Sequence, residues 1–178
     1  MTTSANADCN FVTADYLTEI DKPKSIKSIE IEVPKSAKYS RNLVKIMVVK
    51  SEHIPPELKK NFRAIVTINY TFGSCNYSAK VRQKGDFKDH IEFKDGGKPF
   101  RSLKVKLGDG NILNAVEFSL LIPETRRNLN EVLGTVLMRN LGFITPETFQ
   151  VETIVNGVSA LMLFQENSQK ELLERNIR

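Results

Sequence analysis

The chain has 178 residues, a length that suits one ordinary domain with a short arm. Its hydrophobic content of 40%, charged content of 26% and net charge of +5 are compatible with a globular protein that has an anionic partner. No apolar run reaches the roughly 18 residues of a membrane-spanning helix, and the polar first ten residues do not make a secretory signal, so we expect no membrane association. Cys9 and Cys75 are too few for a disulfide framework or a zinc site, and both are expected to be reduced thiols in a cytoplasmic protein.

The first half of the chain predicts a flexible arm over residues 1–24 and then a series of strands. Most of these stretches carry apolar residues at nearly every second position, which is typical of half-buried strands. A continuous apolar run predicts that residues 43–49 form a strand buried on both faces. The predicted strands are residues 25–33, 43–49, 64–72 and 77–84, the last two joined by a turn at Gly73 and Ser74.

The second half predicts a loop, four more strands and the clearest helix of the chain. Residues 85–101 are rich in Gly, Asp and Lys and indicate a loop. The further strands are residues 102–107, 116–122, 148–155 and 158–164, with tight turns at residues 108–111 and at Asn156-Gly157. Apolar residues at helical spacing over 129–141 predict a packed helix, with Asn128 as its N-cap, Glu131 completing a capping box and Gly142 as its C-terminal stop.

This order of elements predicts an α+β fold, a mostly antiparallel sheet with one main packed helix, over residues 25–165. Residues 166–178 indicate the start of a charged helix with few apolar positions. We therefore expect a fragment whose following segment is truncated.

Basic residues alternate along two of the predicted strands. Lys80, Arg82 and Lys84 share one strand face, and Lys104 and Lys106 share a face of the strand after the loop. If the two strands are neighbours, these cations favour an anion on one surface of the sheet. The alternative is that they are solvated charges that protect sheet edges.

Two further groups are candidates for chemistry. Asp86, Asp89 and His90 are residue types that bind metals, although Asp side chains in such a loop more often bond nearby backbone N–H groups. Arg126 and Arg127 precede the predicted helix and could clamp a phosphate or form ordinary ion pairs. We assign no metal site from these patterns.

In order along the chain, several short segments resemble the spore-coat protein H (CotH) kinase family. Residues 80–86 resemble its R-x-x-G segment, residues 102–107 its lysine-bearing strand, and residues 126–142 its "R-N-x-L … L-G" helix. Residues 151–157 are similar to its "N-G" hairpin and residues 164–166 to its strand ending in Glu. The match covers about half of the chain.

The resemblance implies the N-terminal lobe of an atypical kinase-like fold that binds ATP and Mg²⁺. In that picture Lys104 or Lys106 neutralises nucleotide phosphates together with Arg82, and Gln165 and Glu166 lie beside the adenine. The supporting residues would be Lys80, Lys84, Glu131, Arg126 and Arg127, with Glu131 orienting the strand lysine. The acidic residues that hold Mg²⁺ and position an acceptor belong to a following lobe, so the fragment itself is not expected to be catalytic.

The sequence thus favours a nucleotide-binding lobe of a CotH-like phosphotransferase, with a protein as a candidate substrate. The alternative is a non-enzymatic binding or assembly module that uses the same basic face for an anionic partner. Nucleic acid is not expected, because the basic strands carry no interleaved aromatic residues for base stacking. The sequence identifies neither the phosphate acceptor nor the oligomeric state.

Overall fold

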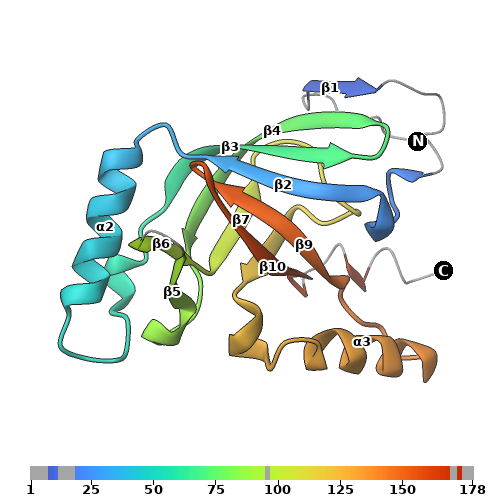
Figure 1. Ribbon diagram of the computed structural model, residues 1–178. Helices are drawn as coiled ribbons and strands as arrows, with labels where there is room; N and C mark the ends of the chain where they lie inside the picture. Colours follow the sequence, from blue (N-terminus) through green and yellow to red (C-terminus); the bar gives the residue numbers. More distant parts are fainter. Residues whose placement is uncertain (1–7, 12–18, 95–96, 169–171, 174–178) are drawn as a thin grey trace.

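A computed structural model describes residues 8–11, 19–94, 97–168 and 172–173, and its main feature is a closed barrel of seven strands (Figure 1). The described strands are β1 Asp8–Phe11, β2 Ile26–Glu32, β3 Phe62–Tyr70, β4 Gly73–Gln83, β5 Ile91–Lys94, β6 Lys98–Arg101, β7 Leu103–Leu107, β8 Glu117–Leu121, β9 Thr148–Val155 and β10 Val158–Glu166. Around the barrel the order is β4, β3, β2, β9, β10, β8 and β7, and β7 pairs again with β4. All neighbours are antiparallel except β2 and β9.

The length of β4 explains how the sheet closes. One edge of β4 pairs with β3 over 73–81, while the other edge pairs with β7 over 79–83 and with β1 over 73–76. Each barrel strand therefore has a neighbour on both sides, and the barrel strands leave little unpaired edge. The β5–β6 hairpin stands apart as a small second sheet.

The barrel interior is the hydrophobic core. Alternate residues of each strand point inward, so β3 and β4 bury every second side chain over most of their length. Aromatic rings contribute to this core, and Phe118 and Phe149 each stack on Phe164 with ring centroids 4.7 Å apart. The opposite side chains of β4 and β7, including the predicted basic residues, consequently face outward.

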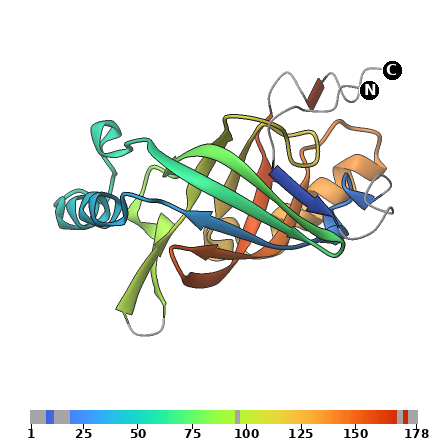
Figure 2. The ribbon, with the colours of Figure 1, turned by 90° about the horizontal axis from the view of Figure 1, so that it is seen from above.

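Two longer helices lie outside the barrel, α2 Ser36–Val48 and α3 Asn130–Asn140 (Figure 2). Short 3-10 turns occur at η1 Pro23–Ser25, η2 Pro56–Leu58, η3 Lys88–His90 and η5 Pro123–Arg126. In Figure 1 α2 stands at one end of the molecule beside β5 and β6, and α3 lies below the other end. Within the described residues, no helix is long and apolar enough to cross a membrane.

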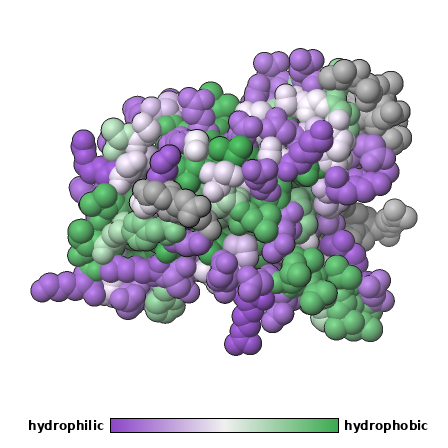
Figure 3. Space-filling model, viewed as in Figure 1, coloured by the Kyte–Doolittle hydropathy of each residue, from purple (hydrophilic) through white to green (hydrophobic). Residues whose placement is uncertain are grey.

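The predicted kinase-lobe sheet with one main packed helix is wrong. The sheet closes on itself, and the helix expected to pack, α3, has no buried residue. Its apolar side chains are exposed, with Leu133 63% and Leu137 61% accessible, and Figure 3 shows them gathered as an apolar patch. The strands bury their inner side chains against one another, so the barrel interior is filled without a cover from α3.

The predicted strand over 43–49 is also wrong, because these residues form the second half of α2. Tyr39, Leu43 and Ile46 are buried at helical spacing, which the apolar run over 43–49 conceals. The predicted loop over 85–101 contains η3 and the β5–β6 hairpin. The predicted N-cap is wrong as well, since Leu129 is the N-cap of α3 and no side chain caps it.

The strands over 25–33, 64–72, 77–84, 102–107 and 116–122 and the Asn156-Gly157 hairpin are confirmed within one to four residues at their ends. The two cysteines differ from the expectation, since Cys9 and Cys75 form a disulfide that joins β1 to β4. The register of β1 on β4 places the two residues directly opposite each other. The sequence alone does not reveal this register. Of the predicted C-terminal helix, only residues 172–173 belong to the described part of the chain.

Candidate functional site

Strand register brings several predicted site residues into one row on the outer face of the barrel. Arg82 on β4 pairs with Lys104 on β7, and Lys104 pairs with Ser119 on β8. Ser119 in turn pairs with Gln165 on β10. Because directly paired residues project to the same side of a sheet, these four side chains share one surface.

A second row runs beside the first. Lys80 pairs with Lys106, and Lys106 pairs with Glu117 at the start of β8. Arg63 on β3 extends this row past Lys80. Between the two rows lies an open hollow of about 390 Å³, lined by Asn61, Lys80, Arg82, Lys104, Lys106 and Glu117. The pairing of the two basic strands, which the sequence left open, is therefore observed in the structure.

Lys104 is held by the acidic member of this hollow. Its Nζ lies 2.5 Å from Oε1 of Glu117, which also accepts a 2.6 Å hydrogen bond from Nδ2 of Asn167. Burial opposes ionisation of Glu117, but the hydrogen bonds from Lys104 and Asn167 outweigh it and hold the Glu117 pKa below its usual range. Glu117 therefore stays ionised at neutral pH and fixes the Lys104 ammonium at the surface.

Glu131 makes a different contact from the one that the resemblance implies. Its Oε1 accepts a 2.6 Å hydrogen bond from Nε2 of Gln165, so this bond ties the start of α3 to β10. The carboxylate that pairs with Lys104 is Glu117, from the neighbouring strand. Glu131 thus positions Gln165 and the helix.

Two cations that flank the hollow increase its positive potential. The Lys84 pKa is lowered, first by burial and then by the nearby charges of Lys104, Arg126 and Arg82. Arg126, in η5, has a buried Nε that finds no hydrogen-bond partner within the described residues. Arg127 is exposed, with a left-handed backbone at φ 51°, and does not line the hollow. Of the adjacent arginines, Arg126 is the one that joins the cluster.

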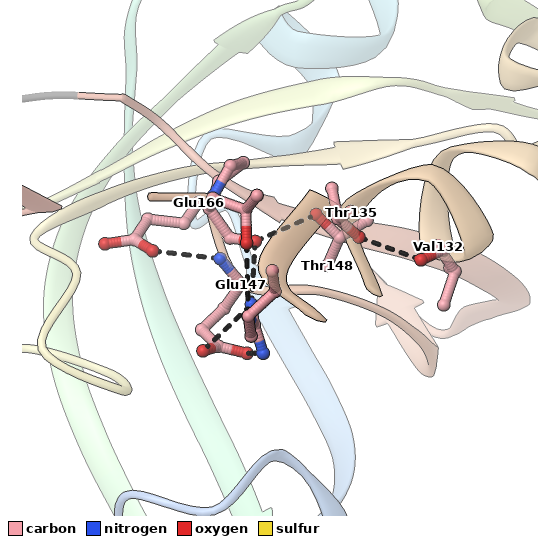
Figure 4. A network of polar contacts seen from close by, with 8 residues as sticks. Val132, Thr135, Glu147, Thr148 and Glu166 are labelled. Carbon is pink, nitrogen blue, oxygen red and sulfur yellow. Dashed lines mark hydrogen bonds and ion pairs between the residues drawn. The ribbon is translucent and has the colours of Figure 1, made fainter. Parts of the chain in front are cut away.

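Glu166 lies on the opposite face of β10 from Gln165. Its side chain is 2% exposed and accepts a 3.0 Å hydrogen bond from the Glu147 backbone N–H, as Figure 4 shows. The backbone around Gln165 pairs with β8 on one edge and with β9 on the other. These residues therefore leave no free backbone edge against which a base could form a pair of hydrogen bonds.

In the loop after β4, the residue types that can bind metals instead make contacts within the protein. Asp86 forms an ion pair with Lys59, and Nδ1 of His90 lies 2.9 Å from Oγ of Ser102. Gly85 has a left-handed φ of +90°, and a Cβ there would lie 1.9 Å from Cδ2 of His90. Burial lowers the His90 pKa, the charge of Asp89 opposes this shift, and Arg126 adds to it. Among the described residues, no group of three or more His, Cys, Asp or Glu could hold a metal ion.

Sequence reasoning missed three residues that complete the site, namely Asn61, Glu117 and Asn167. Glu117 occupies a position in the predicted strand over 116–122, and a correct pairing of that strand with residues 102–107 would have placed it beside the lysines. Asn61 and Asn167 lie next to strand ends and carry no periodic signal. Their places depend on how the barrel closes.

The hollow combines four lining cations, two flanking cations and one lining carboxylate. Such an array is suited to neutralise and hydrogen-bond a multiply charged anion. No family model matches the chain, and the search of curated proteins also gave no match.

Proposed function

We propose that this chain binds the phosphate groups of a nucleotide such as ATP in the hollow between β4, β7 and β8. The observation that supports the proposal is the convergence of Lys80, Arg82, Lys104 and Lys106 on one outer face with a single carboxylate among them. Like charges this close repel one another in the free protein. A bound polyphosphate relieves the repulsion and accepts charge-assisted hydrogen bonds from each of them.

The two rows supply different contacts. Arg82 offers a planar fork that suits two phosphate oxygens, whereas Lys80 and Lys106 offer flexible point charges. Lys104 is positioned by Glu117 before any ligand arrives, so little side-chain entropy remains to be lost there. Lys84 and Arg126 add charge from the edge of the hollow.

The proposal covers the phosphates and does not extend to the metal. Mg²⁺ in phosphoryl-transfer sites is held by carboxylates, and the one carboxylate that lines the hollow, Glu117, is engaged by Lys104 and Asn167. The described residues therefore do not fit a Mg²⁺ site. In a CotH-like phosphotransferase the acidic residues would have to come from outside the described part of the chain.

A cytoplasmic location stays a prediction. It rests on reduced cysteines, whereas a Cys9–Cys75 disulfide is more typical of an oxidising compartment. The protein can be isolated from its natural host under acid quench and its free thiols alkylated. Mass spectrometry then distinguishes reduced Cys9 and Cys75 from the disulfide.

Isothermal titration calorimetry with ATP, in the presence and absence of Mg²⁺, tests the proposal. The triple variant K80M/R82M/K106M removes three cations and leaves the Lys104–Glu117 pair intact. We expect ATP affinity to fall at least about tenfold, since hydrogen bonds to charged groups contribute about 1.5–3 kcal/mol each.

The matched control is K22M/K24M/K27M, which removes the same charge from exposed positions around η1 and β2. Its ATP affinity should stay within about twofold of the parent chain. Equal losses in both triple variants would indicate a general effect of net charge and would count against this site, and so would an absence of ATP binding to the parent.

A further inference from the structure

A second, larger hollow lies between α2 and the start of β3. It has a volume of about 680 Å³ and is walled on one side by α2 and on the other by residues 60–63. Its cationic lining residues are Lys35, Lys38, Arg41, Lys45, Lys60 and Arg63, and the remaining ones are Pro34, Asn42, Asn61 and Phe62. None of the residues that line this groove, hereafter the α2 groove, is acidic.

The helical period places the cations of α2 in one stripe. Lys38, Arg41 and Lys45 recur at three- and four-residue intervals and stand on the helix face next to the buried stripe of Tyr39, Asn42 and Ile46. Neighbouring cations in the stripe are about 5 Å apart along the helix axis. Like charges at this spacing destabilise a helix slightly, so the stripe has a cost without a bound partner.

A buried charge behind the groove adds to its potential. Arg101 is 2% exposed, and its Nη1 donates a 3.3 Å hydrogen bond to Oδ1 of Asn42, which lines the groove. Its Nε and Nη2 are buried and have no hydrogen-bond partner among the described residues, while its guanidinium lies 3.9 Å from the Tyr39 ring centroid. A buried guanidinium without a compensating carboxylate in the described part of the chain is costly, and its field reaches the groove through protein of low dielectric constant.

The shape and chemistry of the groove indicate which anion fits. Phe62 is the only aromatic residue that lines it, and this ring is 9% exposed, so the groove presents no open ring on which a nucleobase could stack. Carboxylates at alternate positions of an extended chain recur about every 7 Å, and the long side chains of the α2 cations bridge the difference from their axial spacing of about 5 Å. The exposed Asn61 amide adds a hydrogen-bond donor and acceptor for the backbone of a bound segment.

We propose that the α2 groove binds an acidic segment of a partner protein, an extended stretch with Asp or Glu at alternate positions. The walls are α2 on one side and the start of β3 on the other, and the carboxylates pair with Lys38, Arg41 and Lys45 across from Lys60 and Arg63. Asn61 lines both this groove and the hollow on β4 and β7. A bound segment therefore ends close to the proposed phosphate site.

Fluorescence anisotropy with a fluorescein-labelled (Glu-Gly)5 peptide tests the proposal on the full chain at low and moderate salt. One wall is altered in K38E/K45E and the other in K60E/R63E, so that a folding defect confined to α2 does not decide the result. We expect each double variant to weaken peptide binding at least tenfold at low salt. The control K24E/K27E makes the same change in net charge at exposed positions and should change affinity less than threefold.

Several outcomes overturn the proposal. They are the absence of peptide binding to the parent chain, equal losses in the control and the wall variants, and tighter binding of a labelled dT20 oligonucleotide than of the peptide. The wall variants and K80M/R82M/K106M share no residue, and each set is assayed with both ATP and the peptide. ATP binding that survives in K80M/R82M/K106M, while the wall variants lose the peptide, would reject the proposed function alone. Peptide binding that survives in the wall variants, while K80M/R82M/K106M loses ATP, would reject the α2 groove alone.

Discussion

Helices α2 and α3 have similar lengths and both carry apolar side chains at helical spacing, but only α2 buries them. Tyr39, Asn42, Leu43 and Ile46 of α2 are buried, whereas α3 buries no residue. Leu133 and Leu137 of α3 are instead among the most exposed apolar side chains of the described residues. Helical periodicity therefore predicts that a segment is a helix, and it does not predict what the helix packs against.

The polar side-chain contacts that hold the two helices also differ, with a buried contact for α2 and contacts at the ends for α3. Asn42 of α2 donates from Nδ2 to the Leu58 carbonyl at 2.9 Å and accepts from buried Arg101. The α3 bonds lie at its two ends, where Glu131 accepts from Gln165 and Arg139 pairs with Glu147 at 3.3 Å. The α2 helix is thus part of the folded core, while α3 is attached at its ends.

Truncation of one apolar side chain in each helix should give the largest difference. Ile46 is fully buried, so I46A should lower the free energy of unfolding by about 3 kcal/mol through lost burial and a cavity. Leu137 is exposed, so L137A should change it by less than about 0.5 kcal/mol. Urea denaturation measures both. Similar losses in the two variants would mean that the apolar face of α3 is covered in solution.

The polar anchor of α2 should have the next largest effect. N42A removes the hydrogen bonds to Leu58 and Arg101 and leaves a buried guanidinium with less compensation, so we expect a loss of about 2 kcal/mol in urea denaturation. S40A on an exposed position of the same helix is the control and should be nearly neutral. If N42A proved neutral as well, the Asn42 contacts would not hold α2.

Loss of the hydrogen bond that attaches α3 to β10 should lower stability less than loss of the Asn42 contacts. Q165A removes the hydrogen bond to Glu131, and we expect a global loss of about 1 kcal/mol. Amide hydrogen exchange should show a larger local effect, with faster exchange in α3 and unchanged exchange in the strands. Uniform acceleration across the barrel would show that α3 is coupled to the core after all.

Polar substitution on the α3 face should have the smallest effect on stability. L133E/L137E places charges on side chains that are 63% and 61% exposed, so the midpoint of thermal unfolding should remain within about 2 °C of the parent chain. Size-exclusion chromatography at several concentrations provides the second measurement. A parent chain that associates while this variant does not would identify the face as a contact between copies.

Much of the barrel could be predicted from the sequence because strand alternation is a local property. The Asn156-Gly157 turn and the alternation in β2, β3, β4 and β7 place these strands within a few residues of their observed ends. The run over 43–49 was misassigned because a short apolar stretch fits a buried strand and a buried helix equally well. Tyr39, one turn earlier, carried the helical signal but lies outside that run.

The candidate site was predictable in part for the same reason. Alternation alone places Lys80 and Arg82 on one face and Lys104 and Lys106 on another. Their meeting required the pairing of β4 with β7, which is the pairing that closes the barrel. The α2 groove has no sequence signal, since one wall comes from a helix whose second half the sequence predicts as a strand, and the other from residues 60–63 at the start of β3.

The sequence by itself determined the strands of the barrel and which side chains share a face, because these depend on a two-residue period within each segment. Only the tertiary structure decided that the sheet closes, that Glu117 and not Glu131 pairs with Lys104, and that α2 rather than α3 joins the core. Register, closure and helix docking depend on contacts between segments far apart in the chain. Local periodicity carries no information about such contacts, and here they decide where the cations meet.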